Sequence, residues 1–185
     1  MVTLGFEGTS LSPRAEAMGD YAGHADEGQR LKKQVTVEGG AAKIAGDTAG
    51  NTSGIGVGPA QRFGRWEART RLSANATDYH GVLLLWPTSG GGGVSPANGG
   101  EVDFSEAIDP SRATVNGFLH VTGADQIGGE VKTDANQWHN WAVEWTATKL
   151  TYYLDGRQWF SVDITANQLP GQMDMTAQLD YFPGD

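Results

Sequence analysis

The chain has 185 residues, of which 19% are charged, and a formal net charge of -9. This length suits one compact domain, so we expect residues 1–185 to share a single core. The negative charge disfavours binding to nucleic acids and to anionic membranes, which recruit Lys and Arg. No cysteine is present, so disulfides and thiolate chemistry are excluded. The first residues lack the basic start and apolar run of a signal peptide, and no stretch approaches the about 20 apolar residues of a membrane helix.

Short segments of alternating apolar and polar residues recur in chain order, separated by Gly, Asn, Asp and Pro. This alternation predicts β-strands. Asp155 and Gly156 lie between two such runs and predict a tight hairpin turn. Residues 165–172 contain the only weak helix signal, which Pro170 and Gly171 would stop after one turn. The segments with the clearest alternation are 31–39, 65–72, 101–106, 114–123, 140–146 and 150–156.

Many strands joined by turns, without the spacing of βαβ units, predict a nearly all-β fold. The expected architecture is an antiparallel β-sandwich or jelly roll in which two sheets bury alternate side chains between them. One sheet of such a fold is often concave and can hold an extended ligand.

The segment EVDFSE gathers Glu101, Asp103 and Glu106 within six residues. Acidic residues are poor strand formers, so their clustering on a strand needs an explanation. On a regular strand Glu101 and Asp103 share one face, whereas Glu106 points to the other. A β-bulge near Phe104 and Ser105 would return Glu106 to the shared face, and bulges are frequent beside active sites.

With such a bulge the Cα atoms of Glu101 and Glu106 lie roughly 13 Å apart, at ~3.3 Å per residue. Their side chains could then bring the carboxyl groups to about 5 Å, the separation of retaining glycosidases, whereas about 6.5 to 9.5 Å would indicate inversion. Crowding of three carboxyls raises at least one pKa, which an acid catalyst requires. A solvated acidic strand or a calcium-binding edge remains the alternative interpretation of the spacing alone.

The motif resembles the Glu-x-Asp-x-x-Glu signature of glycoside hydrolase family 16, in its laminarinase-like, β-bulge branch. The similarity extends to RFGRWEARTRL, GFLHVTG and QWHNWAVEWTATKLTYYLDG, in the family's order, and covers about two thirds of the chain. It implies a concanavalin-like jelly roll with a cleft across its concave sheet. It also implies retaining endo-hydrolysis of a β-linked polysaccharide, with β-1,3-glucan or mixed-linkage β-glucan favoured, by an extracellular, monomeric enzyme that needs no cofactor for catalysis.

The resemblance implies a role for each matched residue. Glu101 would attack the anomeric carbon, Asp103 would orient and tune it, and Glu106 would act as acid and base. His120 matches a family histidine that could bind the carboxyls or the sugar, although a structural role competes equally. Trp86 falls near the position of a family tryptophan that stacks on sugars.

The remaining tryptophans are expected in the core, because alternation buries about half of strand residues. Trp138 is the one among them that we select as a substrate contact. The others are Trp66, Trp141, Trp145 and Trp159.

The sequence departs from the family in two places. The family often shows Trp-Pro-Ala-x-x-Trp where this chain has VLLLW, so a sugar contact is missing. The segment MDMTAQLDYFPGD resembles the family's penultimate core strand, which indicates either a shortened C-terminus or a last strand that includes Asp180 and Tyr181. The terminal strands of the family commonly hold structural calcium, with an acidic segment such as FEGTSL nearby, so a calcium site is left open here.

Two other functions remain open at this point. A non-catalytic carbohydrate-binding or structural sandwich would use the same fold, although the presence of all three acids favours catalysis. A transglycosylase would form the same glycosyl-enzyme intermediate and pass it to another sugar instead of water.

Overall fold

A computed structural model describes residues 6, 8–74, 76–89, 100–121 and 126–184. Its helical part is limited to two 3-10 turns, η1 (His24–Asp26) and η2 (Lys32–Gln34). No helix in the described ranges is long and apolar enough to cross a membrane. The segments FEGTSL, which contains Glu7, and GFLHVTG, which ends at Gly123, lie partly outside these ranges.

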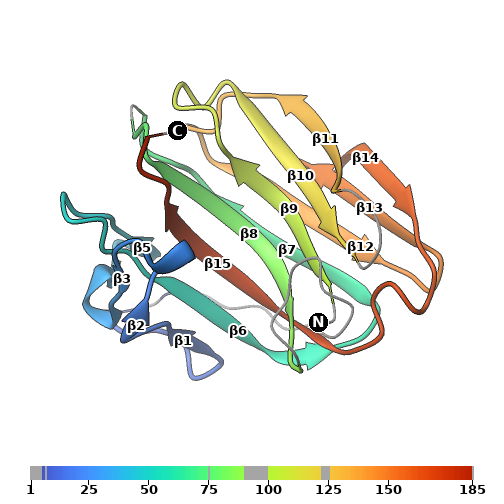
Figure 1. Cartoon of the computed structure of the whole chain (residues 1–185), viewed down its shortest axis with the longest axis horizontal. Helices are drawn as coiled ribbons and strands as arrows, with labels where there is room; N and C mark the ends of the chain where they lie inside the picture. Colours follow the sequence, from blue (N-terminus) through green and yellow to red (C-terminus); the bar gives the residue numbers. More distant parts are fainter. Residues whose placement is uncertain (1–5, 7, 75, 90–99, 122–125, 185) are drawn as a thin grey trace.

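The body of the molecule is a sandwich of two antiparallel sheets (Figure 1). The larger sheet has seven strands in the order β1-β6-β15-β8-β9-β10-β11, and the smaller has four in the order β14-β13-β12-β7. The expected all-β jelly-roll sandwich is thereby confirmed. The strands of the larger sheet are β1 (Ala15–Ala17), β6 (Gly54–Gln61), β15 (Met173–Tyr181), β8 (Tyr79–Pro87), β9 (Glu101–Ala107), β10 (Thr114–His120) and β11 (Ile127–Lys132). Those of the smaller sheet are β14 (Arg157–Asp163), β13 (Lys149–Leu154), β12 (His139–Trp145) and β7 (Gly64–Thr70).

Two small two-stranded sheets precede β6 in the chain and lie beside the β1 and β6 end of the larger sheet (Figure 1). One pairs β2 (Tyr21–Ala22) with β3 (Gln29–Arg30), and the other pairs β4 (Val35–Glu38) with β5 (Ala41–Ile44). An isolated parallel bridge between Arg30 and Thr52 joins β3 to the segment that leads into β6. This bridge fixes the first of the small sheets against the sandwich.

The hydrophobic core lies between the two large sheets and follows the alternation of their strands. On β8, Leu83 and Leu85 belong to this core cluster, whereas Leu84 between them is buried on the opposite face of the sheet. Trp141 and Trp145 of β12 fill the core from the other sheet and are almost completely buried. Burial of such aromatic side chains gives the sandwich its largest hydrophobic contributions.

The predicted hairpin is present, because β13 and β14 pair in antiparallel fashion across Asp155 and Gly156. Both turn residues have positive φ, 48° for Asp155 and 77° for Gly156, the conformation that this turn requires. Residues 165–172 form only a turn, closed by the Gln168 amide donating to the Thr165 carbonyl.

The last strand, β15, pairs with β6 on one side and with β8 on the other. It therefore occupies a central position in the larger sheet. Asp180 and Tyr181 are the last two residues of this strand.

Candidate active site

Strand β9 carries the three acidic residues near the middle of the larger sheet, and its pairing contains the expected bulge. On β8, Leu84 faces Asp103 but Leu83 faces Ser105, so Phe104 is an extra residue. The other neighbour, β10, shows the same shift between its pairs with Asp103 and Glu106. The bulge therefore lies at Phe104 and Ser105, where the sequence predicted it.

The bulge places all three acids on one face. Val102 and Phe104 belong to the core cluster, so Glu101 and Asp103 point to the opposite face. After the extra residue, Ala107 also enters the core, which leaves Glu106 on the face of the other two acids. We call this side of the seven-stranded sheet, which points away from the four-stranded sheet, the open face.

Asp103 is almost completely buried, with 2% of its surface exposed, whereas Glu101 and Glu106 are half-buried. His120 of β10 stands opposite Glu101, and its Nε2 lies 2.9 Å from Asp103 Oδ2. The histidine thus links the middle acid of the motif to the neighbouring strand, which is one of the two roles that the sequence left open for it.

Burial and mutual repulsion raise the pKa of every acid in the motif. Burial is the main cause of the rise of the Glu101 pKa to about 8, and the charge of Asp103 adds to it. The pKa of Glu106 rises to about 7 through burial and the charge of Asp180. The Asp103 pKa rises well above its usual range through burial and the charge of Glu106. His120 acts in the opposite direction on both glutamates.

These shifts describe a cluster that retains protons near neutral pH. Because the carboxyls interact strongly, their protons titrate as a property of the group and not of one residue. A cluster of this kind holds both a carboxylate and a carboxylic acid at the same pH, which are the two forms that nucleophilic and acid catalysis require.

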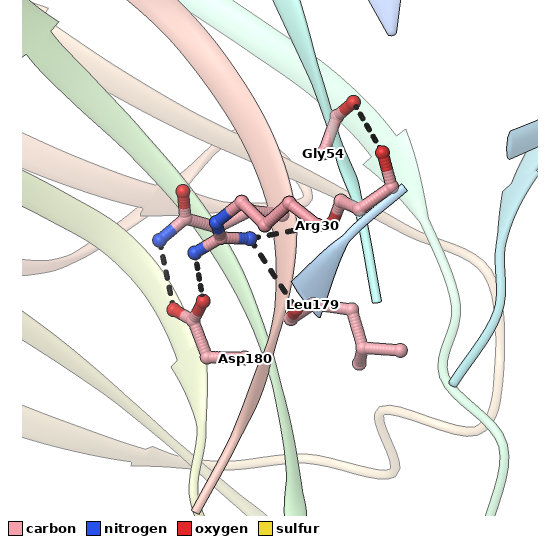
Figure 2. A network of polar contacts seen from close by, with 6 residues as sticks. Arg30, Gly54, Leu179 and Asp180 are labelled. Carbon is pink, nitrogen blue, oxygen red and sulfur yellow. Dashed lines mark hydrogen bonds and ion pairs between the residues drawn. The ribbon is translucent and has the colours of Figure 1, made fainter. Parts of the chain in front are cut away.

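A second polar network lies on the open face at the end of β15, and Figure 2 shows it from close by. The Arg30 guanidinium reaches from β3 to form a buried ion pair with the Asp180 carboxylate. It also donates to the main-chain carbonyls of Ser53 and Leu179, both at 3.5 Å. The Gln178 amide donates to the other Asp180 oxygen at 2.8 Å.

The network influences the pKa values of the acids through the charge of Asp180. Asp180 stands opposite His80, and two residues along the same strands Gln178 stands opposite Val82, which faces Glu106. Asp180 raises the pKa of Glu106, as well as those of the other two acids. The ion pair with Arg30 opposes that influence, because it places the positive charge of the guanidinium beside the Asp180 carboxylate.

The two tryptophans predicted as sugar contacts, Trp86 and Trp138, lie on different sheets. Trp86 of β8 has 37% of its surface exposed and follows Leu85, the partner of Val102, so it stands beside Glu101 on the open face. Trp138 has 42% exposed but precedes β12 of the smaller sheet, where Arg69 and Arg71 lie over its ring at 5.3 and 5.4 Å. The structure thus brings Trp86 to the acids and places Trp138 in a different environment.

The other tryptophans follow the expectation for core residues. Trp66, Trp141 and Trp145 are buried, and Trp159 packs against the core from β14.

A hollow of about 440 Å³ adjoins the acids on the side of β10 and β11. Its lining includes Asn116, which stands opposite Glu106, and Phe118, which stands opposite Asp103. Gln126 and Glu130 of the β11 side add further polar groups. Polar side chains around one aromatic ring are suited to the hydroxyl groups and the C-H face of a sugar.

The described residues contain no group of three or more His, Asp or Glu side chains placed to hold a metal ion. Calcium also binds main-chain carbonyl and amide oxygens, and Glu7 of the N-terminal acidic segment lies outside the described ranges, so a calcium site stays an expectation.

Sequence reasoning did not place Arg30, Gln178 or Asp180 in the site. Gln178 and Asp180 were detectable, because polar residues alternate with apolar ones along the whole of β15. That pattern predicts one strand face in the core and one polar face beside the acids. Arg30 comes from a two-residue strand that carries no such pattern.

The sandwich with a buried carboxylate cluster on its open face is the arrangement of a carbohydrate-active jelly roll. Residues 26–185 match Glycosyl hydrolases family 16. The chain belongs to this family, as its motif indicated.

Individual relatives are distant. A beta-glucanase of Rhodothermus marinus is 24% identical over 100 residues, a match that covers 50% of this chain and 35% of that relative. The laminarinase catalytic domain from Thermotoga maritima superposes with a TM-score of 0.76 at 16% identity, covering 98% of this chain and 87% of that one. Porphyranase B from Zobellia galactanivorans superposes with a TM-score of 0.75 at 15% identity, covering 96% and 78%. These structural neighbours share the fold.

Proposed function

We propose that this chain is a retaining endo-glycosidase that hydrolyses a β-linked polysaccharide, with β-1,3-glucan or mixed-linkage β-glucan as the favoured substrate. The observation that supports it most is the bulge at Phe104 and Ser105, which places both glutamates on the face that carries Asp103. Family membership and the glucanase among the relatives support the substrate class.

In the first step a Glu101 oxygen attacks the anomeric carbon, and Glu106 gives its proton to the glycosidic oxygen. The bond between the anomeric carbon and that oxygen breaks, so the leaving sugar departs as an alcohol. Glu101 is then joined to the glycosyl group as an ester, and Glu106 has become a carboxylate.

In the second step Glu106 takes a proton from a water molecule, whose oxygen bonds to the anomeric carbon. The ester bond breaks and Glu101 returns to a carboxylate. Two inversions at one carbon give net retention. Asp103 and His120 hold and tune Glu101 and Glu106 in both steps, through the contact between them and through their charges.

Residues on both sides of the catalytic strand support cleavage within a polymer. Trp86 beside Glu101 is a candidate stacking surface, and the hollow next to β10 offers a second contact region. A polysaccharide is normally met outside the cell, so we expect the enzyme to be extracellular. We also expect it to be monomeric.

The proposal is tested by the release of reducing ends from laminarin, mixed-linkage β-glucan, agarose and carrageenan. Glu106→Gln removes the acid and should lower the rate by about 10²–10⁴-fold, and Glu101→Gln should lower it at least as much. Glu67→Gln is the matched control, because Glu67 is exposed on β7 and pairs with Arg65. Full activity in either active-site variant, or no release by the folded wild type, would reject the proposal.

A further inference from the structure

Two arginines at the end of strand β7 lie on the outer side of the smaller sheet, across the core from the acids of β9. Ala68 and Leu72 pack against the core, so Arg69 and Arg71, which alternate with them, point outward. Both arginines are exposed, and β7 is an edge strand of its sheet. The two guanidinium groups are therefore accessible from solvent.

Both guanidinium groups lie over one indole ring, that of Trp138. The Cζ atom of Arg69 is 5.3 Å from the ring centroid and that of Arg71 is 5.4 Å from it, within the reach of about 6 Å of a cation–π contact. His139 stands opposite Thr70, which brings the preceding Trp138 beside Arg71. The ring keeps 42% of its surface exposed. We call Arg69, Arg71 and Trp138 the arginine–tryptophan cluster.

The N–H groups of the two guanidiniums are not used inside the protein. Within the described ranges neither Arg69 nor Arg71 forms a hydrogen bond or an ion pair. Asp155, the acid that follows Asn140 in the row of Arg69, is engaged elsewhere. His139 Nδ1 lies 2.7 Å from one of its oxygens, and the Asn140 amide donates to the other at 2.9 Å. Each arginine therefore presents a planar fork of N–H donors to solvent.

Arg65, on the same face of the same strand, provides a contrast. Its guanidinium carbon lies 4.4 Å from the ring centroid of Tyr153, and its Nη2 lies 3.0 Å from a carboxylate oxygen of Glu67. An ion pair thus balances the charge of Arg65, whereas no ion pair balances those of Arg69 and Arg71 in the described ranges. Like charges held at one ring repel each other, and an anion bound between them would relieve the repulsion. The cluster is therefore a local cationic site on a chain with a net charge of -9.

The chemistry of the cluster selects an anionic group carried on a sugar. A guanidinium binds the oxygens of an oxyanion through parallel hydrogen bonds, with a geometry that a point charge does not offer. An exposed indole ring packs against the C-H face of a pyranose. Nucleic acids instead recruit a series of Lys and Arg along their phosphates, and the cluster offers two cations.

We propose that the arginine–tryptophan cluster is a surface binding site for an anionic polysaccharide that carries carboxylate or sulfate groups. Arg69 and Arg71 bind the anionic group, and Trp138 stacks on the sugar that carries it. The site goes beyond the proposed hydrolysis, because this binding uses none of the three acids. It anchors the chain to a charged polymer and leaves the open face of the larger sheet accessible.

The test is affinity electrophoresis of the whole chain through gels that contain dextran sulfate, polygalacturonate or neutral dextran. The variants are Arg69→Gln combined with Arg71→Gln, Trp138→Ala, and Arg65→Gln as the matched control from the same strand. Each migration is referred to a gel without polymer, which corrects for the change in charge. Thermal unfolding checks that every variant is folded. Runs at about 10 mM and about 150 mM salt screen exposed charges over about 30 Å and about 8 Å.

The wild type should bind dextran sulfate, polygalacturonate or both, and not neutral dextran, and it should bind more weakly at the higher salt concentration. The polymer that binds more tightly identifies the anionic group as sulfate or carboxylate. The double arginine variant should bind about 10-fold more weakly or worse, since it loses charge-assisted hydrogen bonds. Trp138→Ala should weaken binding roughly 2- to 10-fold. Arg65→Gln should bind like the wild type, and the double arginine variant should release reducing ends from laminarin at the wild-type rate.

Binding that the double arginine variant retains, an equal loss in Arg65→Gln, or no binding of either anionic polymer by the folded wild type would overturn the site. Equally tight binding of a single-stranded oligonucleotide would overturn its assignment to a sugar. A wild type that hydrolyses no glucan but binds an anionic polymer through Arg69 and Arg71 would support the site and reject only the proposed hydrolysis.

Discussion

His120 Nε2 lies 2.9 Å from Asp103 Oδ2, and the two side chains come from adjacent strands of the larger sheet. Asp103 is the most deeply buried acid of the motif, so a partner for its charge is needed. The same histidine lowers the pKa of Glu101 and of Glu106, against the effect of burial. His120 therefore has two effects: it is a partner for Asp103, and it lowers the pKa values of Glu101 and Glu106.

Replacement of His120 by Asn should move the pH dependence of activity to higher pH. The histidine lowers both glutamate pKa values, so its loss raises both. Because the carboxyls titrate as a group, both limbs of the pH profile report pKa values of the group, and both limbs then shift in the same direction. The measurement is kcat/KM from about pH 4 to about pH 10, which covers both the acidic and the alkaline limb of the pH profile.

His139→Asn provides the control for this variant. His139 Nδ1 lies 2.7 Å from Asp155 Oδ2, so it is also a His–Asp contact, but it belongs to the smaller sheet. Its replacement should leave the pH profile in place. A profile of His120→Asn that matches the wild type would show that the histidine does not tune the acids.

The free energy of unfolding should fall as pH rises from about 5 to about 9. Glu101 and Glu106 have folded-state pKa values near 8 and 7, above the usual 4.5, so the folded protein binds more protons than the unfolded chain. Their contribution to stability is present below the unfolded pKa and is lost as pH rises through the folded values. At pH 8, Glu101→Gln should be more stable than wild type by on the order of 1–3 kcal/mol.

Urea unfolding at pH 5 and pH 8 measures this difference, and the gain of Glu101→Gln should be much smaller at pH 5. Glu67→Gln, in an exposed pair, should unfold like wild type at both pH values. If Glu101→Gln were less stable than wild type at pH 8, the raised pKa would be wrong.

Loss of the Arg30 charge should destabilise the fold. Arg30→Met leaves the buried Asp180 carboxylate without its ion pair, which typically costs about 3–5 kcal/mol. The double variant Arg30→Met with Asp180→Leu removes both charges and should recover much of the loss. Chemical denaturation of the single and double variants measures the coupling.

The exposed pair of Arg65 and Glu67, at 3.0 Å, is the comparison for this network. Arg65→Met should cost only about 0–1 kcal/mol, as exposed ion pairs do. An equally small cost for Arg30→Met would mean that the network in Figure 2 contributes little to stability.

Deletion of Ser105 should preserve the fold and a measurable part of the activity. It removes one of the two residues that face Leu83, so the strand becomes regular on both sides of the former bulge. The acid that follows then stays on the open face, because alternation from Asp103 places it there. Circular dichroism and reducing-end release measure the outcome.

Deletion of Val102 is the contrasting variant, because it shifts Glu101 relative to Asp103 and removes a side chain of the core. This protein should lose activity and stability together. If deletion of Ser105 did the same, the bulge would have a structural role beyond setting the face of Glu106.

The sequence predicted those parts of the site that depend on the alternation of strands. The parity of Glu101, Asp103 and Glu106 required a bulge, and the pairing with β8 and β10 contains it at Phe104 and Ser105. The hairpin at Asp155 and Gly156 follows from the turn chemistry of its two residues.

The rest depends on contacts between distant segments. Arg30 and Asp180 are 150 positions apart, and the short strands that carry the N-terminal part give no periodic signal. Trp138 was selected as a substrate contact, and its position over Arg69 depends on the pairing of β12 with β7, which the local sequence does not show.

The most direct test of the account is the identification of the residue that forms the glycosyl ester. A 2-fluoro glycoside of laminaribiose with a good leaving group slows the second step, so the intermediate accumulates on an active enzyme. Mass spectrometry of the digested protein should then find the added sugar on Glu101 and not on Glu106. A label on Glu106, or no label in a protein that hydrolyses laminarin, would contradict a retaining mechanism with Glu101 as nucleophile.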